Sequence, residues 1–546
     1  MKKDAKIKIL ITMGILGTIF GCEKQYPAVE WRTDNSIFNF LASNVDRNGK
    51  LKDTAYDLPD EIKDDEKIGF APGMMDAVFG PDESDDSKKV IGEMADHLKK
   101  IANKGSENSK REFYRLITEN ESAIGIIDKF FQTIIKDALP TQPFLFNFAK
   151  DLATKTNKRN AVKFGIAILG LCQNKSVLAD LKILGLHDEF TVYVTYATIN
   201  LSENPVPDLW YLAQKIDGWG KIQLVRRLSN MELNQKIKDW LILDGYKNNI
   251  MYEELAFTCA VHGLLHEKME LEKIDEKLFK SSADIIEALI DGGPAEDITQ
   301  YIHASSVIKN FVRHAKQHTH DIADFLKLNK IKHFLSELQI DFEEQRKNGW
   351  TEEIITSCLM GIGEILNSRD WSVHAKEGLK SKDKQTYWDA KQAAEKLSID
   401  LWEVVWERLQ ENPLDSSSWY DVTRYSKSGH VELIINFAIE TLPLDEMATG
   451  AKDSLGLGSN YSKFMCLDTI ITYLENYPKK GEKIILTGLK SPVTRNRNMA
   501  VKVLDKWGRE NWSTEIEKEM HHLKDTEPNK DTKENIKRLL NGKKLE

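Results

Sequence analysis

The stretch Leu489–Gly508, "LKSPVTRNRNMAVKVLDKWG", carries the clearest periodic pattern in this chain of 546 residues. After Pro492, a residue type that often opens a helix, apolar side chains recur every three or four positions. This spacing places side chains on one face of an α-helix. The residues of that face are Met499, Ala500, Val503, Leu504 and Trp507. The stretch therefore predicts an amphipathic helix whose apolar face needs a partner.

A looser copy of this pattern follows in "LKDTEPNKDTKENIKRLL", where Pro528 stands 36 residues after Pro492. The order Pro-Val-x-Arg, followed by Ala and then Leu four residues later, resembles the second helix of HEAT repeats. A helical hairpin of this size cannot bury its apolar face alone, so stacked neighbours must complete the core. We therefore predict an all-α fold, an α-solenoid of HEAT-like helical hairpins, with HEAT-like repeats over residues 331–546.

Further toward the N-terminus the chain alternates between helical patterns and short corners, which favours a helical repeat region over residues 109–330. Prolines and glycines mark the corners at Pro140, Pro143, Pro205, Pro207, Gly292, Gly293, Pro294 and Pro413. One stretch, "EFTVYVTYATI" (Glu189–Ile199), is rich in β-branched and aromatic residues and so is compatible with a strand. Its length and its neighbours favour a buried helix.

Gly218, Trp219 and Gly220 are predicted to form a corner between two amphipathic helices, with Arg226 and Arg227 in the second helix. Tryptophan and arginine are frequent anchors of protein interfaces. We therefore take Trp219, Arg226 and Arg227 as candidate partner-binding residues. Packing of the indole between helices is the alternative.

Several stretches in the middle of the chain are similar to a bacterial family of uncharacterised helical proteins, some of whose members carry the label limonene hydroxylase. The similarity covers about residues 60–330. The stretches are "RNAVKFGIAILGL" (Arg159–Leu171), "LHDEFTVYVTYATIN" (Leu186–Asn200), "DGWGKIQLVRRL" (Asp217–Leu228), "IKDWLILDGYKNNIMYEELAFTCAVHG" (Ile237–Gly263) and "DIIEALIDGGPAEDI" (Asp284–Ile298). A hydroxylase needs a haem, a flavin or an iron site. No residue in the sequence can be matched to one, so we expect no cofactor.

The N-terminus has the features of an export signal. A basic segment, residues 1–8, precedes the short apolar run "ILITMGILGTIFGC", which ends at Cys22. A run of about 13 residues is too short to cross a bilayer, which takes about 20, and is typical of a signal peptide. Residues 19–22 resemble the lipobox of bacterial lipoproteins, which implies removal of residues 1–21, lipidation of Cys22 and attachment to a membrane of the cell envelope. An uncleaved apolar helix on a cytoplasmic protein is the alternative.

The segment 22–108 is rich in charged residues and is interrupted by turn-forming residues, which predicts a lipidated tether and irregular lead-in.

The composition of the chain limits the kinds of partner it can bind. The formal net charge is −9, and removal of residues 1–21 with their four lysines and one aspartate makes it −12. Such an acidic chain is a poor match for nucleic acid. The cysteines after Cys22 stand singly in apolar helical contexts, which predicts buried free thiols: Cys172, Cys259, Cys358 and Cys466.

Histidines offer the one candidate metal site. In "VRHAKQHTHD", His314 and His318 are one helical turn apart, and His320 and Asp321 follow. An i, i+4 histidine pair joined by a carboxylate can chelate a divalent metal. His262 and His266 repeat the spacing, and His303 lies between the two pairs. Such pairs are also common on exposed helix faces, so a surface role is the alternative.

Two functions of different classes remain open. The first is a membrane-anchored lipoprotein that acts as a non-enzymatic helical-repeat scaffold and binds a protein or peptide partner. The second is a metal-dependent enzyme with a site around His314, His318 and His320. The repeat pattern favours the first function, because stacked helical hairpins create extended binding surfaces.

Overall fold

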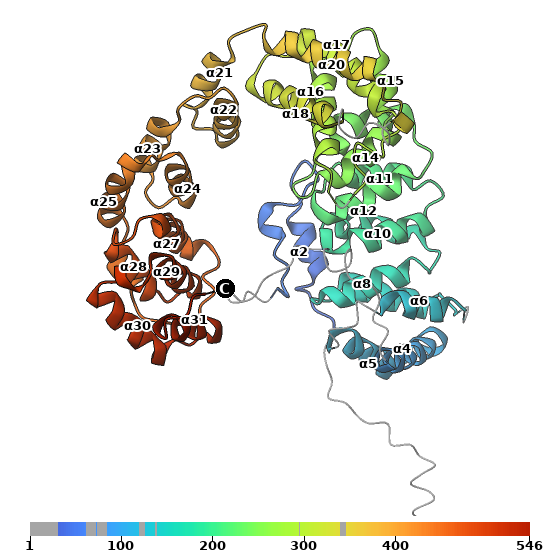
Figure 1. The fold of residues 1–546 in the computed structure, drawn as a ribbon. Helices are drawn as coiled ribbons and strands as arrows, with labels where there is room; N and C mark the ends of the chain where they lie inside the picture. The colour runs from blue at the N-terminus through green and yellow to red at the C-terminus, as the bar shows by residue number, and fades with distance from the viewer. Residues whose placement is uncertain are drawn as a thin grey trace, which may run out of the picture. The chain divides into compact units, whose positions relative to one another are not determined.

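The computed structural model (Figure 1) describes residues 31–61, 73, 85–119, 126–136, 139–293, 295–338 and 346–545. Within these ranges the regular structure is helical, with two isolated β-bridges and no strand. The predicted all-α, helical-repeat fold is thereby confirmed. None of the helices in these ranges combines the length and the apolar character that a membrane crossing requires.

The described residues form two compact units. Unit 1 contains the described residues up to 234 together with 248–251, and unit 2 contains 235–247 and the described residues from 252 onward. The helices of unit 1 are α2 (Ile37–Ser43), α4 (Asp85–Lys104), α5 (Glu107–Glu119), α6 (Ile127–Lys136), α7 (Phe144–Thr154), α8 (Arg159–Leu169), α9 (Leu178–Leu184), α10 (Asp188–Leu201), α11 (Val206–Ala213) and α12 (Gly218–Ser229).

Unit 1 contains three successive helical hairpins. They pair α7 with α8, α9 with α10 and α11 with α12. The second helices of these hairpins, α8, α10 and α12, pack side by side in that order (Figure 1). Their first residues, Arg159, Asp188 and Gly218, are separated by 29 and 30 residues. These hairpins are therefore shorter than the 36-residue spacing that the C-terminal pattern indicates.

Unit 2 is also built from paired helices and contains more of them. It opens with α13 (Gln235–Trp240), which runs into a π-helical turn at Leu241–Gly245. The following helices are α14 (Glu253–His262), α15 (Leu265–Glu270), α16 (Glu276–Asp291), α17 (Ala304–His318), α18 (Ile322–Leu338), α20 (Glu352–Leu366), α21 (Trp371–Gly378), α22 (Lys384–Lys396), α23 (Trp402–Glu411), α24 (Ser416–Tyr425), α25 (Val431–Thr441), α26 (Leu444–Met447), α27 (Ser462–Tyr473), α28 (Glu482–Leu489), α29 (Thr494–Trp507), α30 (Thr514–Thr526) and α31 (Lys530–Leu540).

The stretch that predicts the fold forms α29, between α27 and α31. Of the predicted face, Ala500, Val503, Leu504 and Trp507 are buried, and Met499 is partly buried. The Trp507 indole N–H donates a 2.8 Å hydrogen bond to the carbonyl of Leu474. Helices α27, α29 and α31 pack in sequence, as the hairpin repeat predicts. One continuous apolar core runs from Leu379 to Leu539 through this part of unit 2.

Ion pairs join neighbouring hairpins of unit 2. Lys391 of α22 binds Asp421 of α24, with both side chains largely buried and a shortest N···O distance of 2.7 Å. Arg495 of α29, which is partly exposed, binds Asp468 of α27 at 2.5 Å. The next residue but one on α29, Arg497, binds Glu527 after α30. A charged pair between two helices favours one position of the helices along each other, because sliding would move the two charges apart.

The lead-in predicted over residues 22–108 is not irregular throughout. Residues 85–104 form α4, a 20-residue helix that packs on α5 and α7. Its buried residues, Ile91, Met94, Leu98 and Ile101, recur at helical spacing. The prediction was wrong there because the dense charges on the other face of α4 resemble those of a tether. The stretch Glu189–Ile199 lies within α10, which confirms the predicted buried helix.

The corner predicted at Gly218, Trp219 and Gly220 lies slightly earlier in the chain. Helix α12 already begins at Gly218, so Trp219 and Gly220 belong to its first turn. Gly218 has a φ of +82°, a value that favours glycine. Gly218 and Gly220 both lie beside the carboxyl group of Asp188.

The cysteines of the described residues are buried free thiols, as predicted: Cys172, Cys259, Cys358 and Cys466. Burial raises the pKa of Cys172 to about 12, so its thiol stays protonated.

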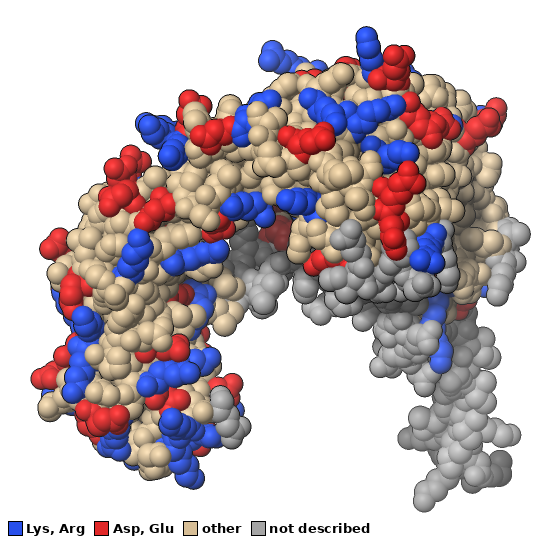
Figure 2. All heavy atoms as spheres, turned by 45° about the horizontal axis from the view of Figure 1, so that its top comes forward, with Lys and Arg blue, Asp and Glu red and all other residues tan. Residues whose placement is uncertain are grey.

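On the face in Figure 2, lysine and arginine side chains are interspersed with aspartate and glutamate over the described surface.

Candidate functional site

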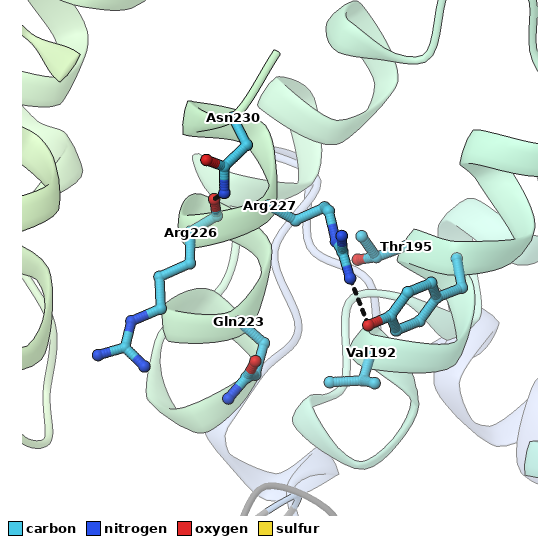
Figure 3. A pocket seen from close by; sticks show the side chains of 7 residues that line it. Val192, Thr195, Gln223, Arg226, Arg227 and Asn230 are labelled. Atoms are coloured by element: carbon cyan, nitrogen blue, oxygen red, sulfur yellow. Dashed lines mark hydrogen bonds between the residues drawn. The ribbon is translucent and has the colours of Figure 1, made fainter. Parts of the chain in front are cut away.

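The candidate site is a pocket in unit 1 between α10 and α12. Its volume is about 270 Å³. The lining side chains are Val192, Thr195 and Tyr196 from α10, Gln223, Arg226 and Arg227 from α12, and Asn230, the residue that follows α12 (Figure 3). Gln223 precedes the other three by three, four and seven residues, so all four lie toward one side of the helix. The lining contains two guanidinium groups and no carboxylate.

Tyr196 and Arg227 form one wall of the pocket as a pair. Arg227 donates a hydrogen bond to the phenol oxygen of Tyr196, drawn as a dashed line in Figure 3. The guanidinium carbon lies 4.7 Å from the centroid of the Tyr196 ring, within the range of a cation–π contact. The Tyr196 side chain is 52% exposed. Because the phenol oxygen accepts from Arg227, its own hydrogen remains available to a further acceptor.

The carboxamides on the same side of α12 add both donors and acceptors. Asn230 Nδ2 donates to the carbonyl of Arg226 at 2.9 Å, which leaves its side-chain oxygen available. The Gln223 carboxamide makes no hydrogen bond to another described residue. Thr195 is committed to its own helix, since its hydroxyl donates to the Thr191 carbonyl at 2.8 Å. The pocket therefore carries positively charged groups and also has carboxamide oxygens that can accept hydrogen bonds.

Of the three predicted partner-binding residues, Arg226 and Arg227 line the pocket and Trp219 does not. Trp219 is half-buried in the first turn of α12. In Figure 3 the side chains of Arg226 and Arg227 point in different directions, as expected for consecutive helical residues. The other lining residues were not predicted from the sequence, and these include Tyr196. The spacing of Gln223 and Asn230 around the two arginines would have indicated that they share one side of the helix.

At their other ends, α10 and α12 meet through a carboxyl group and two glycines. Asp188, the first residue of α10, is 7% exposed. A methyl group at Gly218 would stand 1.9 Å from Asp188 Oδ2, and one at Gly220 would stand 2.6 Å from Thr191 Oγ1 and 2.9 Å from Asp188 Oδ1. The Gly218 amide donates to the side-chain oxygen of Asn248 at 2.7 Å. Gly218 therefore makes room for the Asp188 carboxyl group, and Gly220 makes room for both Thr191 and Asp188.

Asp188 and Glu189 are adjacent carboxyl groups in opposite electrostatic environments. Burial, together with the charges of Asp217 and Glu189, raises the pKa of Asp188 to about 8, and the facing Gly220 amide compensates only partly. Burial also acts to raise the pKa of Glu189, but Lys163 and the Gly73 amide outweigh it and the pKa is lowered. The Lys163 ammonium lies 2.5 Å from Glu189. At neutral pH Asp188 is therefore mostly protonated and Glu189 ionised.

Replacing Asp188 with asparagine is expected to remove a pH dependence of stability. The pKa of Asp188 is higher in the folded chain, about 8, than its usual value of 3.8. The folded state thus holds a proton that the unfolded state releases, and the free energy of unfolding falls as pH rises from about 4 to about 8, by up to about 1.4 kcal/mol per pH unit. Urea unfolding at pH 5.5, 7.0 and 8.5 should show a fall that is smaller in Asp188→Asn. Equal pH slopes in the two proteins would contradict this assignment.

Three of the four predicted metal ligands in unit 2 contact other protein groups through their side chains. His314 is buried in α17, and its Nε2 lies 3.1 Å from the carbonyl oxygen of Met269. Asp321 binds Lys280 at 2.7 Å. The His318 ring stacks on Phe279, and His320 is exposed. Helix α17 ends at His318, which places His320 and Asp321 outside its regular face. In the described part of the chain, no group of three or more His, Cys, Asp or Glu residues is placed to hold a metal ion.

The second histidine pair does not share a helix face. Helix α14 ends at His262, and Leu264, with a φ of +60°, separates it from α15. His266 therefore belongs to a different helix. Its ring stacks instead on His303, with 3.8 Å between the ring centroids. The i, i+4 spacing in the sequence was not a guide to proximity here because the helix is interrupted between the two residues.

Cys22 and the predicted signal peptide, residues 1–21, lie outside the described residues, as does the start of the tether. No protein-family model, curated protein or solved structure matches the chain. The similarities to bacterial lipoproteins and to the family that includes the label limonene hydroxylase therefore stay predictions. The geometry of the pocket is the basis for a functional proposal.

Proposed function

We propose that the protein is a lipid-anchored, non-enzymatic helical-repeat scaffold that binds a protein or peptide partner through the α10–α12 pocket. The observation that supports this function most directly is the pairing of an exposed tyrosine with an arginine in a surface pocket on a repeat fold. Tyrosine and arginine are among the residues most enriched at the energetic centres of protein interfaces. Repeat folds commonly use such surfaces for binding.

The size of the pocket favours a side chain over a whole small molecule. Sites for drug-sized ligands and cofactors usually enclose roughly 300–1,000 Å³. At about 270 Å³ this pocket falls below that range and can hold one or two side chains of a larger partner. A partner whose contacts extend beyond the pocket would gain the remaining binding energy from the neighbouring helix surface.

The anchor is the second part of the proposal. Lipidation of Cys22 would attach the chain to a membrane through acyl chains, and two or more chains hold a protein stably at about 0.8 kcal/mol per buried CH₂ group. The partner would then meet the scaffold at a membrane surface. This part rests on the sequence of residues 1–22 alone.

A photocrosslinking experiment in the protein's own membranes tests the proposal. Asn200, exposed on α10 one helical turn after Tyr196 and outside the pocket lining, is replaced by p-benzoylphenylalanine, and exposed Asn103 on α4 is the matched control position. We expect a polypeptide adduct at position 200, none at position 103, and loss of the adduct when Arg227→Glu is added. The intact mass of the purified protein should also show the loss of residues 1–21 and acyl chains on Cys22.

Two results would contradict the proposal. Equal adducts at positions 103 and 200, or adducts that persist with Arg227→Glu, would show that the pocket does not bind a specific partner. An unprocessed chain without acyl groups would overturn the anchor. A bound metal or small cofactor in the native mass would instead favour the enzyme.

A further inference from the structure

The charges around the α10–α12 pocket indicate the chemistry of what it binds. Arg226 and Arg227 both line it, and none of its lining residues is acidic. This is a local excess of positive charge in a chain whose net charge is −9. Elsewhere, on the face in Figure 2, cationic and acidic side chains are interspersed. An anionic group is therefore the complementary occupant.

The position of the anion follows from the Tyr196–Arg227 pair. The phenol hydrogen of Tyr196 is free to donate, because the phenol oxygen accepts from Arg227. Arg227 has five N–H donors, and its bond to Tyr196 uses one of them. An oxygen anion beside this pair can thus receive hydrogen bonds from both side chains. The existing contact also holds the guanidinium in place, which lowers the entropy cost of binding.

The carboxamides indicate that the anion belongs to a peptide. Asn230, the residue that follows α12, is seven residues after Gln223, which is about 10.5 Å along the helix axis. An extended peptide covers this distance with about three residues. A carboxamide can pair with both the N–H and the C=O of a peptide backbone. The two carboxamides can therefore bind backbone groups on either side of a side chain that reaches Arg227.

The directions of the arginines favour a carboxylate over a phosphate group. In Figure 3, Arg226 and Arg227 do not converge on one point. A doubly charged phosphate is best served by convergent guanidinium groups, whereas one guanidinium matches one carboxylate. Val192 adds an apolar contact beside the pair. The lining is thus matched to a carboxylate on a short aliphatic stem.

We propose that the α10–α12 pocket binds an extended peptide segment of the partner through a single Asp or Glu side chain. Arg227 and Tyr196 bind its carboxylate, and Gln223 and Asn230 bind the adjacent backbone. This inference rests on the proposed function, since it specifies the partner that the scaffold recognises.

Peptide pools with one fixed position test the inference on the whole protein. The pools are fluorescein-labelled, amidated hexapeptides with Glu, Asp, Gln, Asn or phosphoserine at the third position and mixtures of Ala, Leu, Ser and Val elsewhere. Fluorescence anisotropy should show the Glu and Asp pools binding at least about tenfold more tightly than the Gln and Asn pools, as expected for one charge-assisted pair. Arg227→Gln should abolish this preference.

Two further variants separate the pocket from general charge. Tyr196→Phe removes one hydrogen bond and should weaken the acidic pools about two- to tenfold while leaving the amide pools unchanged. Arg424→Gln is the matched control, because Arg424 is another half-exposed arginine over a tyrosine ring, 5.5 Å from the Tyr425 centroid. We expect Arg424→Gln to bind every pool as the native protein does.

Several outcomes would overturn the inference. Equal binding of acidic and amide pools, or an unchanged preference in Arg227→Gln, would exclude a carboxylate at this site. Tighter binding of the phosphoserine pool would replace the carboxylate with a phosphate. No binding of any pool, with the crosslink at position 200 retained, would overturn the inference but keep the proposed function. Loss of both would contradict both.

Discussion

Replacing Gly218 with alanine is expected to lower the free energy of unfolding by about 3 kcal/mol or more. Two costs add. Gly218 has a φ of +82°, and a left-handed conformation costs a non-glycine residue about 1–3 kcal/mol. The new methyl group would also stand 1.9 Å from Asp188 Oδ2, so the buried carboxyl group must leave its position or α10 and α12 must move apart. Urea unfolding should report the global loss, and hydrogen exchange followed by mass spectrometry should show faster exchange of the α12 amides.

Gly92→Ala is the matched control in the same unit. Gly92 lies in α4, and a methyl group there meets nothing within 4 Å. Alanine in an exposed helix interior should be neutral or stabilise by up to about 1 kcal/mol. Adding Asp188→Ala to Gly218→Ala should recover the part of the loss that comes from the collision. If Gly218→Ala is as stable as the native chain, the carboxyl group does not occupy the start of α12.

The helices were predictable because their signals are local. The face of α29 follows from spacings of three and four residues, and its core residues such as Leu504 and Trp507 are buried as the pattern requires. Helix α4 was missed although its apolar residues have the same spacing, since charged neighbours dominate its composition. Periodicity was thus the better guide to structure, and composition the weaker one.

The candidate site was only partly predictable because it depends on contacts between hairpins. Arg226 and Arg227 stand out by residue type alone. Tyr196 lies in a β-branched and aromatic stretch that indicates burial, yet it is 52% exposed. Asp188 is unremarkable until α10 packs on α12, 30 residues later in the chain. No local sequence pattern indicates the contact between α10 and α12. The burial that accompanies this contact also raises the pKa of Asp188.

Contacts between neighbouring second helices are of two kinds. In unit 1 the protonated Asp188 carboxyl group fits against the glycines of α12. Buried ion pairs join second helices in both units, through Lys163 and Glu189 in unit 1 and through Lys391 and Asp421 in unit 2. Both arrangements fix one hairpin relative to the next. Their energies differ, because an ionised pair in a dry environment depends on both partners being present. The most buried pair is therefore the most sensitive to single substitutions.

Replacing Arg497 with methionine is expected to destabilise the C-terminal repeats by about 3–5 kcal/mol, the cost of leaving a buried charge without its partner. Arg497 and Glu527 both have fully buried side chains. The guanidinium donates two hydrogen bonds to the carboxylate, at 2.7 and 2.6 Å, and a third to the Ser491 carbonyl at 2.8 Å. Methionine fills a similar volume but satisfies none of these groups. Urea unfolding and hydrogen exchange of α29 and α31 should measure the loss.

The physical cause can be separated from lost packing by a second substitution. Arg497→Met with Glu527→Leu removes both charges, and a buried pair replaced by apolar residues is often neutral, so the double variant should recover most of the stability. Arg509→Ala is the matched control, since Arg509 binds Glu517 with both side chains partly exposed and should contribute less than about 1 kcal/mol. If the double variant is as unstable as Arg497→Met, the loss comes from packing around the long side chain. If Arg497→Met lowers the free energy of unfolding no more than Arg509→Ala does, Glu527 is hydrated in the variant. Its pair with Arg497 then does not hold the α30–α31 hairpin in place.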